Sequence, residues 1–167
     1  MKGVIAHNSI VKQVETKIES QLPDGVRANV QKIVVAGLKY AMKDGADGLL
    51  GHLKGSQDPV GDIVKGVIAI IGLLRKAARG AMPQNAMIPA AFILVLQGLD
   101  FAERAGILKV TNEEVNTATK LFANTLLPHL GVTPEKMGQM AGTATQIMND
   151  PMKAGQMQAA LGQMGGQ

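Results

Sequence analysis

The sequence contains no cysteine, and this absence excludes three kinds of chemistry together. Without a thiol the chain forms no disulfide, no thiolate nucleophile and no zinc–sulfur site. A cysteine-free chain also suits the reducing cytoplasm, and residues 1–7 lack the apolar core of a secretory signal. We therefore expect a protein made in the cytoplasm whose fold is held by non-covalent packing.

Aromatic residues are almost as scarce, because Tyr40, Phe92, Phe101 and Phe122 are the whole set among 167 residues. The core must be built from Val, Ile, Leu, Met and Ala, which pack well between helices. Such residues offer few flat surfaces on which bases or sugars stack. A net charge of +4 is mild, and the basic residues are dispersed. Neither feature is typical of a nucleic-acid-binding protein.

One basic cluster does occur, at Arg75, Lys76 and Arg79. It follows an apolar run, where cations at a helix C-terminus interact favourably with the helix dipole. We interpret it as a solvated helix end, with nucleic-acid contact as the alternative.

Motifs for catalysis or cofactor binding are also absent. No HExxH, GxxxxGK[ST] or GxSxG pattern is present, and His7, His52 and His129 lie too far apart in sequence to form a metal pair at helical spacing. The sequence therefore predicts no cofactor, no metal site and no small-molecule substrate. We expect a protein that is not an enzyme.

The carboxylates Asp100 and Glu103 stand one helical turn apart, and Arg104 is beside them. General acid–base work is one interpretation of such a pair. An ion pair within or between helices explains the spacing better.

The strongest feature present is a pair of apolar segments between Asp58 and Gly106. In the first, Asp58 is a suitable N-cap and Pro59 suits the first helical position. Apolar residues then recur at helical spacing as far as Leu74. The second runs from Met87 to Leu99, and we expect Pro89 in its first turn with an extended residue before it. Together they predict a central apolar helical hairpin in an all-α, multi-helix bundle.

The second segment carries no charge from Gly80 to Leu99, which raises the question of a membrane span. Pro83 and Pro89 interrupt it and leave about ten strongly apolar residues where a span needs about 20. A buried core hairpin is therefore the preferred interpretation, and membrane insertion is the alternative. Within the hairpin, Ile68, Ile71, Leu94 and Leu96 are expected to include deeply buried positions.

Local signals place further helices on both sides of the hairpin and predict six to eight helices with no sheet. Gly106 should adopt the left-handed conformation that ends a helix, and Thr111 with Glu114 forms a capping box. In the first helix we expect a core-facing stripe of Ile10, Val14, Ile18 and Leu22, with Glu15 in solvent. The expected helices are 8–21, 25–43, a short one at 49–54, one from 111 to about 130, and others starting at 133 and 150.

The composition changes after residue 136. Six of the ten methionines lie between Met137 and Met164, among Gln, Gly and Ala. Methionine adapts to irregular partners, and glycines in an apolar helix allow close approach of another backbone. We divide the chain into a helical domain, 1–150, and a tail, 151–167, that is flexible or held by a partner. The predicted interface consists of Gly61, Gly66, Gly72, Met137, Met140, Met148, Met152, Met157 and Met164.

From Met87-Ile88-Pro89-Ala90-Ala91-Phe92 to Lys109-Val110-Thr111-Asn112-Glu113-Glu114-Val115, the chain resembles the small helical virion proteins of tailed bacteriophages. It shares their cysteine-free, methionine- and glycine-rich composition and their polar tail. The resemblance implies a structural, non-enzymatic virion subunit, made in the host cytoplasm, that assembles with copies of itself or with other virion proteins. The alternative is a membrane-active internal virion protein whose hairpin, Val60 to Leu99, inserts in the cell envelope.

Overall fold

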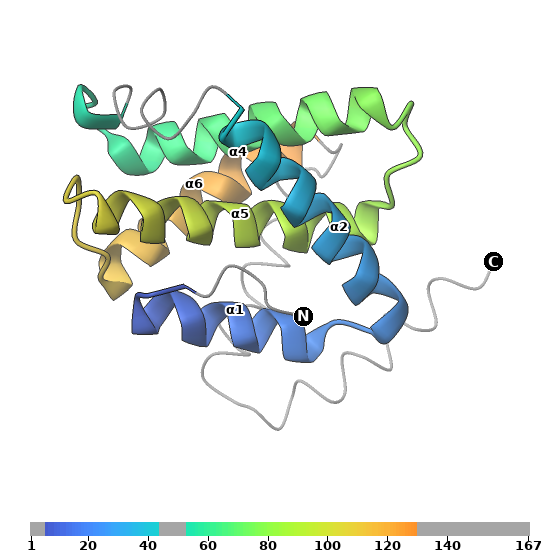
Figure 1. Cartoon of the computed structure of the whole chain (residues 1–167), viewed down its shortest axis with the longest axis horizontal. Coiled ribbons are helices and arrows are strands. Elements are labelled where there is room, and N and C mark those ends of the chain that lie inside the picture. Colours follow the sequence, from blue (N-terminus) through green and yellow to red (C-terminus); the bar gives the residue numbers. More distant parts are fainter. Residues whose placement is uncertain (1–5, 44–52, 130–167) are drawn as a thin grey trace. The chain divides into compact units, whose positions relative to one another are not determined.

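The computed structural model describes residues 6–43 and 53–129. Within these two ranges all regular structure is helical and no strand occurs, so the predicted all-α fold class is confirmed (Figure 1). The helices are α1 (Ser9–Gln21), α2 (Asp24–Ala41), α4 (Pro59–Ala77), α5 (Gln84–Arg104) and α6 (Asn112–His129).

Contacts divide the chain into one unit of Met1–Thr125 and another of Leu126–Gln167. Helices α1, α2, α4 and α5 and the residues of α6 up to Thr125 belong to the first unit. The predicted domain boundary at residue 150 lies outside the described residues and stays a prediction. The same is true of the expected helices at 133 and 150 and of the short helix at 49–54, apart from Leu53 and Lys54, which are helical.

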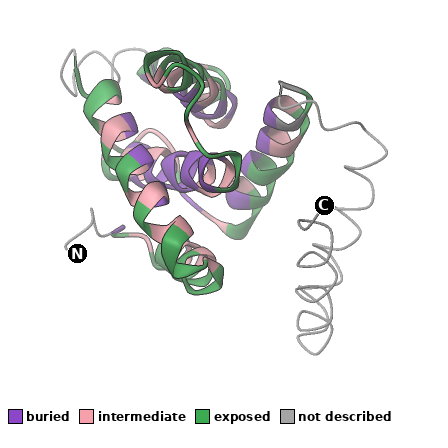
Figure 2. Cartoon of the chain, turned by 90° about the vertical axis from the view of Figure 1, so that its right-hand side faces the viewer, coloured by how far each residue is buried: buried purple, intermediate pink, exposed green. Residues whose placement is uncertain are grey.

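Helix α5 is the centre of the first unit, and α1, α2 and α4 pack against it. Figure 2 shows the surrounding helices with their buried faces turned towards α5 and their exposed faces outward. Twelve of its residues are buried, including the unbroken run from Ile93 to Gln97. By length and composition α5 is apolar enough to cross a membrane, and 67% of its apolar window is buried inside the protein.

Helix α4 forms the predicted hairpin with α5 and covers it with one face only. Ile63, Val64, Val67 and Ile71 are buried on that face, whereas Leu73 is 44% exposed. Among the other positions expected in the core, Leu94 and Leu96 are buried and Ile68 is half-buried.

The predicted helix ends are largely confirmed. Asp58 accepts a hydrogen bond from the N–H of Gly61 at 2.9 Å, with Pro59 at the first position of α4. Gly106 has a φ of +70° and the N–H of Ile107 bonds back to the carbonyl of Ala102 at 2.9 Å. Such local signals work because each cap satisfies backbone groups that the helix leaves unpaired.

The capping box at the start of α6 also forms. Glu114 accepts from the N–H of Thr111 at 3.1 Å and from its hydroxyl, and this hydroxyl bond lowers the pKa of Glu114. The Thr111 hydroxyl oxygen accepts from the N–H of Glu113, one residue earlier than expected.

The expectation for Pro89 is wrong, because α5 begins five residues earlier, at Gln84, and Pro89 lies inside the helix with Ile88 helical before it. The carbonyl of Pro83 starts the helix by accepting from the N–H groups of Ala86 and Met87. Pro89 then removes one hydrogen bond just after the first turn. Ala86 and Met87 are both buried, and their apolar packing stabilises the first turn of α5, although Pro89 predicts that the helix starts later.

Close helix approach occurs at two glycines that were not predicted for it. A β-carbon at Gly37 would lie 2.5 Å from Leu94 Cδ1, and one at Gly98 would lie 2.6 Å from Ile63 Cγ2. These glycines therefore let α2 and α4 approach α5. At Gly66 and Gly72 nothing lies within 4 Å of the β-carbon position, so they have no such role within the described chain.

Two leucines test the assignment of the core. Leu96 is fully buried and Leu73 is 44% exposed. We expect Leu96→Ala to lower the free energy of unfolding by about 2–5 kcal/mol, through lost apolar burial and a cavity. Leu73→Ala should lower it by less than about 1 kcal/mol, because the side chain is already largely hydrated. Urea unfolding of both variants and the parent checks this, and equal losses would contradict the central position of α5.

Candidate functional site

A groove of 530 Å³ opens between α2, α4 and α5. We call it the α2–α4–α5 groove. Its lining is mainly apolar, with side chains from all three helices and from the helical residue Leu53. The apolar lining residues are Leu38, Ala41, Met42, Leu53, Ile63, Val67, Ile70, Leu94 and Phe101.

A few polar side chains line the same groove. Asp62 accepts a hydrogen bond from the Ser56 hydroxyl at 2.6 Å, and Lys65 Nζ lies 3.8 Å from its carboxylate. Gln97 and Arg104 contribute from α5. A largely apolar concave surface with a small number of polar groups is the usual composition of a binding site.

On the α4 side the groove lining includes a glycine. Gly66 lines it, is exposed, and has nothing within 4 Å of where a β-carbon would stand. A larger residue at this position would project into open space beside Val67 and Ile70. Glycine inside a helix costs about 1 kcal/mol relative to alanine, so this open surface is present at some expense of stability.

Apolar side chains are also exposed on α2 and α4. Val35, Tyr40, Met42 and Leu73 are between 41% and 44% exposed, and Met42 belongs to the groove itself. Single exposed apolar residues are ordinary, so of these four it is Met42, in the groove lining, that adds to the apolar surface there.

The predicted interface glycines have different positions. Gly61 is buried beside the Asp58 N-cap, Gly66 lines the groove, and Gly72 is exposed on α4 outside the groove lining. The six predicted interface methionines lie outside the described residues. The structure thus brings only Gly66 of this set into the groove, and the other groove residues were not identified from the sequence.

The basic cluster at the end of α4 is solvent-facing. Arg75, Lys76 and Arg79 are all exposed, and Arg79 has a φ of +50° just before Gly80 at +79°. The N–H of Gly80 bonds to the carbonyl of Arg75 at 3.1 Å, which ends the helix. This position fits the interpretation as a solvated helix terminus.

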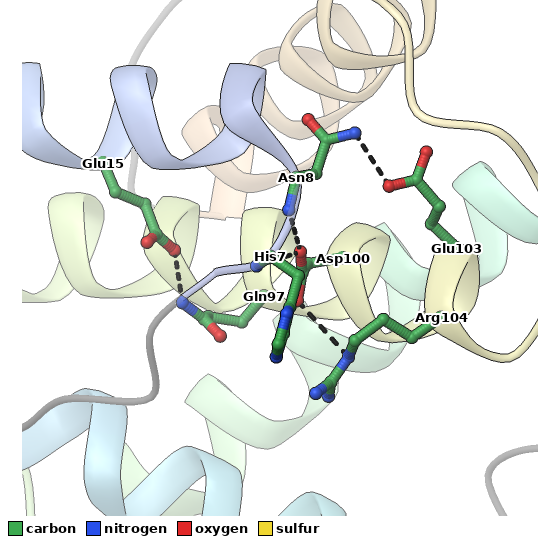
Figure 3. A network of polar contacts seen from close by, with 7 residues as sticks. All are labelled: His7, Asn8, Glu15, Gln97, Asp100, Glu103 and Arg104. Carbon is green, nitrogen blue, oxygen red and sulfur yellow. Dashed lines mark hydrogen bonds and ion pairs between the residues drawn. The ribbon is translucent and has the colours of Figure 1, made fainter.

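A second cluster of polar residues joins the start of α1 to the end of α5 (Figure 3). Its centre is Asp100, which is 1% exposed. One carboxylate oxygen accepts from the N–H groups of His7 at 2.8 Å and Asn8 at 2.7 Å, and the other lies 3.5 Å from Arg104 Nε. The predicted ion pair is confirmed as an intrahelical pair, and the bonds to α1 are additional.

Asn8 links the same region to the start of α6. Its side-chain oxygen caps α1 by accepting from the N–H groups of Ile10 and Val11. Its amide nitrogen donates to Glu103 at 2.7 Å, and Glu103 accepts from the N–H of Val110 at 2.8 Å. Glu103 therefore ties two segments to α5.

The expectation that Glu15 faces solvent is wrong, whereas the four residues of the expected stripe, Ile10, Val14, Ile18 and Leu22, are half-buried. Val11 is the fully buried residue of the helix, and Glu15, one turn on, is half-buried rather than in solvent. Gln97 donates to Glu15 at 2.5 Å across the interface with α5. The cap that Asn8 forms and its bond to Glu103 hold the start of α1 against α5.

Burial is the main reason that the pKa of Glu15 rises from 4.5 to about 7. The hydrogen bond from Gln97 acts in the opposite direction, and the nearby charges of Glu19 and Asp100 raise the pKa further. A raised carboxyl pKa is often found in active sites. Here the raised carboxyl faces another helix of the same chain, so a structural role explains it.

The polar cluster anchors several segments of the fold to α5. Its carboxylates accept from backbone and side-chain donors of the residues directly before α1, of α5 and of the segment before α6. Among residues 6–43 and 53–129, no group of three or more His, Asp or Glu residues is arranged to hold a metal ion. We therefore regard the α2–α4–α5 groove as the candidate functional site.

If Asp100 anchors the start of α1, its removal should destabilise the protein and open the backbone at His7 and Asn8. Asp100→Ala removes the acceptor for two backbone N–H groups, and we expect a loss of about 2–4 kcal/mol in the free energy of unfolding. Hydrogen exchange should show lost protection at His7 and Asn8. Asp24→Ala is the control, because that side chain is 97% exposed. Its ion pair should contribute less than about 1 kcal/mol. Unchanged protection at His7 and Asn8 in the Asp100 variant would contradict the anchor.

Glu15 predicts a pH dependence with a defined sign. The folded protein keeps the proton of Glu15 up to a pKa of about 7, whereas the unfolded chain releases it near 4.5. Stability therefore falls as pH rises through this window, because the folded state binds more protons than the unfolded state.

We expect Glu15→Gln to be more stable than the parent at pH 8 and to lose most of this advantage at pH 4. Thermal unfolding across that range checks the prediction. Glu113→Gln, at an exposed position of α6, controls for the loss of one charge. A constant difference between Glu15→Gln and the parent at all pH values would contradict it.

No protein-family model, curated protein or solved structure that was compared with the chain matches it. The geometry of the chain and its sequence are therefore the basis for assigning a function.

Proposed function

We propose that this protein is a non-enzymatic assembly subunit of a bacteriophage virion, which packs on copies of itself and on other virion proteins. The single observation that carries the assembly role is the apolar α2–α4–α5 groove, whose lining includes the exposed side chain of Met42. Burial of such surface stabilises association by about 25 cal/mol per Å². The virion assignment is supported by the sequence resemblance alone.

The polar residues support the same proposal by their arrangement. Asp100, which is 1% exposed, bonds to the backbone of His7 and Asn8 just before α1 and to Arg104. The groove contains only a few polar side chains, and Asp62 among them is bonded to Ser56 and Lys65. Groups already engaged in structural bonds do not favour an acid–base role.

Membrane activity is the second candidate, because α5 has the length and composition of a membrane span. In the folded protein, α1, α2 and α4 cover this helix. Insertion would therefore require α5 to leave these partners and expose Asp100. This requirement makes assembly the better-supported function.

Sedimentation of the full-length protein tests the proposal. We expect species larger than the 17.5 kDa monomer, with a population that grows as protein concentration rises through the micromolar range. The same preparation should release no dye from phospholipid vesicles.

Two outcomes contradict the proposal. A monomer at high micromolar concentration that also binds no purified virion protein would exclude assembly. Dye release by such a monomer would favour the membrane-active alternative.

A further inference from the structure

We propose that the α2–α4–α5 groove receives residues 137–164 of a second copy of the chain. This inference rests on the proposed function, because it requires self-association, and it adds the two surfaces that meet. The groove is one surface. The other is the methionine-bearing segment that follows the described part of the chain.

The length and sequence of that segment suit it to the role. Residues 130–167 supply 38 residues beyond α6, and the stretch 137–164 contains only two charged side chains, Asp150 and Lys153. Its large apolar residues fall at helical spacing in two groups. The first group is Met137, Met140, Ile147, Met148 and Met152, and the second is Met157, Leu161 and Met164.

The lining of the groove is complementary to such residues. Three helices provide aliphatic surface and Phe101 an aromatic one, and a groove of 530 Å³ accommodates several side chains. Amphipathic segments bind apolar grooves through anchors at this spacing. Methionine suits an irregular groove because it is unbranched and polarizable, and it makes favourable sulfur–aromatic contacts.

The arrangement predicts head-to-tail assembly. Each copy would offer one groove and one segment, so a segment bound by a neighbour leaves that neighbour's own segment available. Contacts of this kind generate rings when the rotation closes and filaments when it does not. The exposed apolar residues outside the groove, Tyr40 and Leu73, would be further covered by the same neighbour.

Because the chain has no cysteine, disulfide cross-linking tests this contact without background. One preparation carries Gly66→Cys, in the groove. It is mixed with preparations that carry Met140→Cys, Met148→Cys or Met157→Cys. Gly25→Cys is the matched control, because Gly25 is also an exposed helical glycine with nothing within 4 Å, and it does not line the groove.

We expect at least one methionine position to cross-link to Gly66→Cys about ten-fold faster than to Gly25→Cys, because a bound segment has a raised effective concentration. Equal rates at all three methionine positions would overturn the proposal. A single chain that carries Gly66→Cys together with one of the methionine-to-cysteine substitutions tests whether the segment occupies the groove of its own chain. If it closes an internal disulfide at high dilution while the mixed preparations do not cross-link, the occupant is the chain's own segment and the proposal is overturned.

A second measurement separates this inference from the proposed function. Gly66→Glu should fold, because its side chain meets open space, and it should place a charge in the groove and abolish assembly in sedimentation. Gly25→Glu should assemble like the parent. If the parent assembles and Gly66→Glu assembles equally well, only the groove contact is overturned.

If Gly72→Glu blocks assembly and Gly66→Glu does not, the contact lies on the outer face of α4, and the groove is again overturned. A parent that never assembles removes the proposed function as well.

Discussion

The rest of the described structure depends on the need to cover α5. Four successive residues, Ile93, Leu94, Val95 and Leu96, are all buried, and successive helical residues point about 100° apart. Partners are therefore needed around the whole circumference of the helix. α1, α2 and α4 pack against it, and Phe122 of α6 lies 5.4 Å from Phe92 between ring centroids. The membrane-like composition of α5 follows from this burial, because core and lipid favour the same residues.

Asp100 is the buried charge on this helix, and its hydrogen bonds fix the position of α1 along α5. Apolar contacts alone allow one helix to slide along another with little change in energy. A carboxylate that accepts from the backbone N–H groups of His7 and Asn8, which directly precede α1, fixes that helix in one register. The same register carries Glu15 into a half-buried position near Asp100. Because α1 is anchored in this register, Glu15 is partly buried and its pKa is raised.

The sequence predicted those features that depend on neighbouring residues. The Asp58 cap, the Gly106 turn and the Thr111 box each involve groups within a few positions. Pro89 was placed wrongly because tertiary burial of Ala86 and Met87 outweighs a local helix-start signal. Glu15 was placed wrongly because the face of α1 that is withdrawn from solvent is wider than the predicted stripe and also includes Val11 and Glu15. The groove was not predicted, since its lining comes from three helices whose relative positions no local pattern specifies.

The groove itself follows from how α2 and α4 meet α5. Gly37 on α2 and Gly98 on α5 allow α2 and α4 to approach α5 closely. Met42 on one side and Ile70 on the other are left lining the space between them. A larger residue at Gly66 would extend into this space, and it would stabilise α4 by up to about 1 kcal/mol relative to glycine. The groove lining has no side chain at that position, and an apolar segment bound there would bury apolar surface that the fold leaves open.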